Sequence, residues 1–164
     1  DRLMAAPISR LAVVLSRVLH SSVQVVAQTV IILVVATLLG ATGPFNVLGT
    51  FVALIIVCLL GTGFAALSNG FAILLQREEP LVVIGNLMTM PLLFFSSAMV
   101  PASFLPPWMA YVAHINPIHY AVDGVRSALQ GNLDATLALN ITMVTVFAAV
   151  TSAWSIHSFK RLRD

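Results

Sequence analysis

Charged residues are scarce in this chain of 164 amino acids. Only 9% of its residues are Asp, Glu, Lys or Arg, whereas a soluble domain typically carries about 25%. Hydrophobic residues make up 59%. So few charges cannot cover a water-facing surface, which excludes an ordinary soluble domain and indicates an integral membrane protein. The eight basic and six acidic residues are dispersed, so a nucleic-acid partner, which needs a clustered basic face, is also excluded.

Cysteine is nearly absent too, and phosphate-binding loops are missing. The single Cys58 lies within an apolar run, so no disulfide can form inside the chain. No segment matches a Walker A loop, which excludes ATP hydrolysis by the chain itself. The sequence opens at Asp1 without the basic start, apolar stretch and small-residue site of a signal peptide. We therefore expect this sequence to be a fragment of a longer chain.

Apolar residues, in contrast, form four runs that are long enough to cross a membrane. About 20 helical residues span the hydrocarbon core, and the four runs cover residues 18–39, 47–75, 81–100 and 135–159. Pro91 lies near the middle of the third run and predicts a kink there. The sequence therefore predicts an all-α integral membrane protein with four transmembrane helices in one domain, residues 1–164.

The basic residues predict the orientation of these four spans. Seven of the eight lie where an even number of spans places one common side: Arg2, Arg10, Arg17, Arg77, Lys160, Arg161 and Arg163. Only Arg126 lies in a loop of the other side. Since basic residues concentrate in cytoplasmic loops, both termini are predicted to be cytoplasmic. Residues 1–17 then read as a cytoplasmic pair of amphipathic helices broken at Pro7.

Residues 101–131, between the third and fourth spans, are predicted to form two short external helices. Pro107 lies in the first turn of one. Asn116 and Pro117 are the N-cap and first residue of the other, and Gly131 is its stop. An apolar stripe and a polar row run along this second helix: Ile118, Val122, Val125 and Leu129 in the stripe, His119, Asp123, Arg126 and Gln130 in the row. A pair of helices this apolar is expected to be re-entrant or interfacial.

The polar residues of this second external helix are the first candidate site. Asp123 and Arg126 are three residues apart and can pair on one helix face, which lowers the cost of placing charge near lipid. With Asn116 and Pro117 they form a candidate external gate over the exit of a transport path. The alternative is that these four residues only cap and anchor a short interfacial helix.

Two kinds of chemistry are considered for the same region. His114, His119 and Asp123 suggest a metal site, but zinc needs three or four convergent ligands and Pro117 interrupts the helix between the two histidines, so a pair of interfacial imidazoles is the better interpretation. An intramembrane hydrolase would need a serine and a base. Its only conceivable set is Ser96 or Ser97 with one of the histidines, and no motif supports it.

The second predicted span carries a row of small and polar residues. Gly61, Ala65 and Asn69 recur every four residues, and Ser68 adjoins them. Small residues at this spacing let helix backbones approach, while polar groups within spans usually face protein or a water-filled path. These four residues are therefore candidates for helix packing, inside the chain or at a dimer seam, or for contact with a transported substrate.

Three segments together resemble the type-2 ABC-transporter permeases, the membrane subunits of bacterial drug, polysaccharide and lipid exporters. The first is LMAAPISR from Leu3 to Arg10, directly before a span. The second is PLLFFSSAMVP from Pro91 to Pro101. The third and most specific combines Pro107-Trp108, Asn116-Pro117 and the DGVR run that ends at Arg126. The drug-exporter branch resembles the chain most. Such permeases usually have six spans, so the resemblance implies a chain truncated at its N-terminus that keeps the last four.

The resemblance also implies a function and partners. It implies a permease subunit of an ATP-driven exporter for a hydrophobic or amphipathic substrate, in the bacterial inner membrane, and not an enzyme. ATP and magnesium would be bound by a separate ABC ATPase, which the coupling residues Leu3, Pro7, Ser9 and Arg10 would contact. A homodimer or paired permease would line the path. A structural or assembly subunit of the membrane is the alternative.

Overall fold

The computed structural model describes residues 10–40, 46–75, 78–99, 104 and 106–161, and these residues form six α-helices. In chain order the helices are α1 (Arg10–Leu38), α2 (Val47–Leu75), α3 (Glu78–Phe94), α4 (Pro107–Ala113), α5 (Pro117–Leu129) and α6 (Ala135–Arg161). The expected all-α class is confirmed. The segment 1–9, which holds most of the predicted coupling segment, lies outside the described residues.

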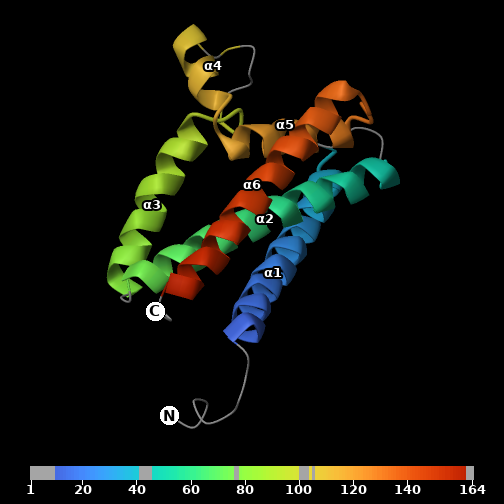
Figure 1. The fold of residues 1–164 in the computed structure, drawn as a ribbon. Helices are drawn as coiled ribbons and strands as arrows, with labels where there is room; N and C mark the ends of the chain where they lie inside the picture. The colour runs from blue at the N-terminus through green and yellow to red at the C-terminus, as the bar shows by residue number, and fades with distance from the viewer. Residues whose placement is uncertain (1–9, 41–45, 76–77, 100–103, 105, 162–164) are drawn as a thin grey trace.

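Helix α2 is the centre of the fold, because α1, α3, α5 and α6 all pack against it (Figure 1). The start of α1, the end of α2, the start of α3 and the end of α6 lie at one end of the bundle. The short helices α4 and α5 lie at the opposite end, where α5 runs across the ends of the longer helices. This arrangement agrees with an even number of crossings between the two ends of the described chain.

Two of the helices are long and apolar enough to cross a membrane, namely α2 over its full length and α6 over Ala135–Ser158. Shorter apolar stretches occur in the other two long helices, at Val23–Leu38 in α1 and Val83–Phe94 in α3. Large hydrophobic side chains project from these helices into the surroundings; Leu38 of α1, for example, is 81% exposed. A surface this apolar is suited to lipid rather than to water.

The predicted limits of the first and third spans differ from the helices. No break separates residues 10–17 from the first span, because one continuous helix begins at Arg10. The sequence from Ile8 to Leu39 contains no glycine or proline that would end a helix. Helix α3 ends at Phe94 rather than at residue 100. Pro91 therefore lies in the last turn of the helix and not in its middle.

The core lies where α2, α5 and α6 meet. It consists of small and aliphatic side chains that are almost fully buried: Ala53, Ile56, Ala121, Ala128, Leu137 and Val144. The helices approach closely because glycines face their neighbours. A Cβ atom on Gly49 of α2 would overlap the carbonyl oxygen of Ala128 in α5, and one on Gly70 would overlap the ring of Trp154 in α6. Small residues thus set the distance between these helices.

Helix α5 buries only part of the predicted apolar stripe. Ile118 of the stripe is buried, and Val125 and Leu129 are half-buried at the edge of the core. The most closely packed face is instead formed by Ala121, Gly124 and Ala128, which are all buried. The reason is the close contact with α2, where a methyl group or a hydrogen fits and a branched side chain does not. The polar row is also uneven, since His119 is buried while Arg126 and Gln130 are exposed.

Candidate functional site

The start of α5 is built by Asn116 and Pro117, as the sequence predicted. The Oδ1 atom of Asn116 accepts a hydrogen bond of 3.0 Å from the backbone N–H of Ile118. Pro117 occupies the first helical position, where its missing N–H costs no hydrogen bond. At the other end Gly131 adopts a positive φ of 78°. Its N–H donates to the Ala128 carbonyl at 3.0 Å, which ends the helix in the expected way.

The same Asn116 side chain also holds the end of α3. Its Nδ2 atom donates to the carbonyl oxygens of Leu92 and of Phe95, the latter at 3.1 Å. Carbonyl groups in the last turn of a helix have no partner within the helix. Asn116, which is only 3% exposed, therefore joins two helices by capping the start of α5 and the end of α3 together. We call this set of three bonds the Asn116 clamp.

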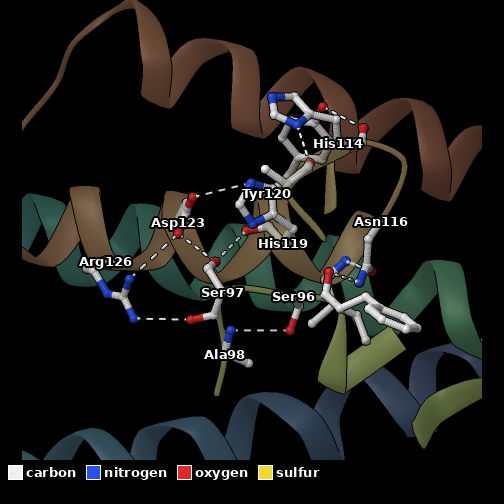
Figure 2. Close-up of polar contacts among 12 residues, drawn as sticks. Ser96, Ser97, Ala98, His114, Asn116, His119, Tyr120, Asp123 and Arg126 are labelled. Carbon is white, nitrogen blue, oxygen red and sulfur yellow. Dashed lines mark hydrogen bonds and ion pairs between the residues drawn. The ribbon is translucent and has the colours of Figure 1, made fainter. Parts of the chain in front are cut away.

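A second connection joins the turn after α3 to the middle of α5, and Figure 2 shows its members converging on Asp123. The hydroxyl of Ser97 donates to Oδ1 of Asp123 at 2.6 Å. Nη1 of Arg126 lies 3.7 Å from the same oxygen, and Nη2 donates to the Ser97 carbonyl at 3.4 Å. The predicted pairing of Asp123 with Arg126 is thus confirmed, and Ser97 is an additional partner. We call these three residues the Asp123 junction.

His119 lies beside this junction and is buried, with 9% of its surface exposed. Its Nε2 atom is 3.6 Å from Oδ2 of Asp123, whereas its Nδ1 atom is buried and makes no hydrogen bond to the described residues. Burial lowers the pKa of His119 from its ordinary value of 6.5; the charge of Asp123 opposes this shift, and His114 adds to it. The imidazole is therefore held in its neutral form more firmly than a solvated histidine.

The serines are not arranged for hydrolysis. Ser96 donates its hydroxyl to the Leu93 carbonyl at 2.7 Å, and Ser97 donates to the Asp123 carboxylate. In a serine nucleophile the hydroxyl proton would instead face a base such as an imidazole nitrogen. Within the part of the chain that the structure describes, no group of three or more His, Cys, Asp or Glu residues could hold a metal ion either.

The residues predicted within α2 lie in three different surroundings. Gly61 faces α1, since a Cβ atom there would lie 3.3 Å from Cγ2 of Val25. Ser68 lines a cavity of about 210 Å³ between α2 and α3, and Ala65 and Asn69 are half-buried.

Of the predicted coupling residues, Leu3, Pro7 and Ser9 lie outside the described residues, and Arg10 is the first residue of α1.

Two features of the site could not be read from the sequence. One is the second role of Asn116, whose amide reaches back more than 20 residues to α3. The other is Ser97, which the sequence suggested only as an unlikely nucleophile. A single serine in a turn belongs to no periodic sequence pattern, so the sequence does not show which group its hydroxyl bonds to. The expected position of Asp123 and Arg126 on one helix face was the only signal that a carboxylate needed partners here.

Comparison with known proteins identifies the family. The model of the ABC-2 type transporter family matches residues 1–129. The chain belongs to this family. The matched residues end at the last residue of α5, so they include both the Asn116 clamp and the Asp123 junction. The ABC-2 type transporter family comprises membrane permeases, which are transport subunits rather than enzymes. No solved structure matches the chain significantly.

Three relatives illustrate the range of the family. The putative transport permease ycf38 of Porphyra purpurea is 32% identical over 127 residues, which are 77% of this chain and 43% of the relative. Nodulation protein J of Sinorhizobium fredii is 27% identical over 86% of this chain and 52% of the relative. The probable doxorubicin resistance permease DrrC of Mycobacterium tuberculosis is 27% identical over 79% of this chain and 47% of the relative.

These matches cover only part of each relative. The chain spans about half the length of the curated relatives it matches. A drug-resistance permease is among them, but the ycf38 permease has the higher identity, so the matches do not single out the drug-exporter branch.

Proposed function

We propose that this ABC-2 permease chain forms part of an ATP-driven exporter for a hydrophobic or amphipathic substrate. The observation that carries the proposal is the placement of α5 across one end of an apolar bundle (Figure 1). This amphipathic helix is tied to the end of α3 by the Asn116 clamp and the Asp123 junction. A link of this kind can hold a path closed at one end while energy enters at the other. ATP and magnesium would bind a separate ATPase subunit.

In this proposal all four apolar helices cross the membrane, with both termini in the cytoplasm of a bacterial cell. The arrangement supports it, because the start of α1 and the end of α6 lie at the same end of the bundle. The basic residues Lys160 and Arg161 follow the apolar part of α6 at that end, as expected for a cytoplasmic boundary. The end with α4 and α5 then faces outwards.

The external gate of the proposed path consists of Asn116, Pro117, Asp123 and Arg126. The packing of α3 supports this role, since α3 makes its main helix contact with α2 and is fastened to α5 by polar bonds rather than by a broad apolar interface. Hydrogen bonds between two elements can break and re-form at modest cost. Separation of α3 from α5 would therefore open the outward end, and two copies of the chain would line the path between them.

The substrate class rests on the surfaces and on the relatives. The 210 Å³ cavity between α2 and α3 is lined mainly by apolar side chains, together with Ser68 and Thr89. Such a lining suits a molecule with a large apolar part. One relative is named for doxorubicin resistance and another for nodulation, so a drug and another amphipathic molecule are both reasonable cargoes for a first transport assay.

The test uses the full-length permease together with its ABC ATPase subunit. Deletion of residues 3–10 is expected to abolish the stimulation of ATP hydrolysis by substrate, because these residues form the proposed contact with the ATPase. Co-purification of the ATPase distinguishes lost docking from lost folding. Substrate-stimulated hydrolysis that survives the deletion would disprove the coupling role. If no ATPase co-purifies even with the intact permease, a structural or assembly role would replace the transport proposal.

A further inference from the structure

Among the described residues, His119 is the one buried titratable side chain with a ring nitrogen that has no hydrogen-bond partner. Nδ1 is buried and without a partner, and Nε2 faces Oδ2 of Asp123 at 3.6 Å. The neutral tautomer with its proton on Nε2 fits both observations. A second proton would have to enter on Nδ1, where no acceptor awaits it. A buried charged donor without an acceptor is costly.

The imidazole of His119 lies next to the contacts between α5 and the turn after α3. Ser97 donates to Oδ1 of the same carboxylate, and its hydroxyl also lies 3.4 Å from the backbone carbonyl of His119 (Figure 2). The turn after α3 thus contacts both the backbone of His119 and the carboxylate that faces its ring. A movement of this turn away from α5 would break both contacts.

We propose that His119 is a proton-binding site that controls the connection between α3 and α5. In the closed arrangement the imidazole is neutral and the Ser97–Asp123 bond is formed. Proton uptake on Nδ1 favours an open arrangement, in which water solvates the imidazolium and the turn after α3 has moved away from α5. Acidification thus releases the connection between α3 and α5, and the ligand that binds at His119 is a proton.

The surrounding charges are few enough to assign the effect to this histidine. On α5 itself Asp123 lies opposite Nε2, and Tyr120 has its ring centroid 5.6 Å away. His114, just before α5, has its ring centroid 6.1 Å away, but it is exposed and its Nδ1 is paired with the Ala110 carbonyl. Arg126 acts on His119 only through the carboxylate that it shares.

The neighbouring elements add one charged group at this end of the bundle, Asp134, which caps the start of α6 by accepting from the Leu137 N–H at 3.0 Å, beyond the far end of α5 from His119. Helix α2 contains no Asp, Glu, Lys, Arg or His between residues 47 and 75. The acidic residues of α3 are its first two, Glu78 and Glu79, and the titratable residues of α6 begin at His157; both groups lie at the opposite end. Within α4, Tyr111 is the only titratable residue, and it is exposed.

The direction of the pH dependence follows from burial. Because burial lowers the pKa of His119 in the closed arrangement, that arrangement binds the proton more weakly than an open one with an ordinary histidine. The closed arrangement is therefore fully favoured above about pH 6.5 and loses stability as the pH falls below it. One proton changes the ratio of open to closed molecules by at most about tenfold per pH unit.

The experiment measures the distance between α3 and α5 directly. In the full-length permease with Cys58→Ala, spin labels are attached at Met90→Cys on α3 and Leu133→Cys after α5, both exposed positions. Pulsed electron paramagnetic resonance is recorded in lipid nanodiscs between pH 8 and 5. We expect a population with a longer distance that grows as the pH falls below 6.5. In His119→Gln this growth is lost, and in the matched control His114→Gln it is retained.

Several results would overturn the proposal. They are a distance that does not change with pH in the parent protein, a pH response that persists in His119→Gln, or one that disappears in His114→Gln. If His119→Gln fails to fold, NMR of ¹³C-labelled histidine in the parent protein replaces it, and a His119 pKa at or above 6.5 refutes the mechanism. The distances do not depend on transport, so a permease that exports nothing can still pass or fail this test.

Discussion

The Asn116 clamp leads to a prediction in which one side chain has two separable roles. Asn116→Ala removes the N-cap bond to Ile118, which costs about 0.5–2 kcal/mol. It also removes the donor for the Leu92 and Phe95 carbonyls, and a buried acceptor without a partner costs about 1–3 kcal/mol. We therefore expect the free energy of opening at this joint to fall by about 1.5–5 kcal/mol.

Asn116→Asp separates the two roles. Aspartate is as good an N-cap as asparagine, so the start of α5 should remain protected. A carboxylate oxygen would however replace Nδ2 and face two carbonyl oxygens, so the end of α3 should lose its protection. The matched control is Asn46→Asp. Asn46 caps α2 through Oδ1 with a bond of 3.2 Å from the Gly49 N–H, and the aspartate preserves that cap.

Hydrogen exchange of the full-length permease in lipid nanodiscs measures the effect locally. A loss of about 1.5–5 kcal/mol corresponds to exchange that is faster by roughly 10- to 4,000-fold, since about 1.4 kcal/mol is tenfold. In Asn116→Ala, peptides around Phe95 and Ile118 should both exchange faster; in Asn116→Asp, only the peptide around Phe95 should. Protection of Phe95 that is unchanged in Asn116→Asp would refute the clamp. Faster exchange throughout the bundle in Asn46→Asp would show that the assay lacks local resolution.

Two further predictions concern packing and the Asp123 junction. Gly49→Ala should lower the thermal unfolding midpoint in detergent, because its Cβ would overlap the Ala128 carbonyl and overpacking costs about 1–3 kcal/mol. The control Gly85→Ala should leave the midpoint unchanged, because its Cβ would meet no atom within 4 Å. Equal midpoints in the two variants would contradict the close packing at Gly49. Asp123→Ala should destabilise by about 1–3 kcal/mol because it leaves the buried Ser97 hydroxyl with only its long 3.4 Å bond to the His119 carbonyl. Arg126→Gln should cost less than about 1 kcal/mol because that side chain is 45% exposed, and an equal loss in both would contradict the assignment.

The limits of α5 could be predicted from the sequence because helix caps depend on neighbouring residues. Asn116 and Pro117 set the start, and Gly131 sets the end, through bonds that span only a few residues. The limits of α2 were predictable for a related reason, since a long apolar run ends where charge begins. The pairing of Asp123 with Arg126 followed from helix geometry alone. All these predictions rest on interactions within one segment.

The end of α3 could not be predicted in this way. The apolar run continues to Val100, and nothing local requires the helix to stop at Phe94. A helix in apolar surroundings can end only where its last carbonyl groups find partners, and the partner for Leu92 and Phe95 is supplied by Asn116, more than 20 residues later. Because α3 stops there, Ser97 lies in a turn from which its hydroxyl can reach Asp123. The two long-range bonds of Asn116 therefore account for the helix end and for the position of the turn that carries Ser97.

The residues proposed as a gate from the sequence are consequently unequal. Asn116 and Asp123 each bond to the segment at the end of α3 from buried or half-buried positions. Arg126 reaches the same segment only through a long 3.4 Å bond from a side chain that is 45% exposed, and Pro117 shapes the start of α5. If α3 and α5 separate during transport, the clamp and the junction must both break. Loss of one connection should then shift the balance towards the open arrangement while the other still restrains it, and their combined loss should exceed the sum of the single effects only if the two connections are coupled.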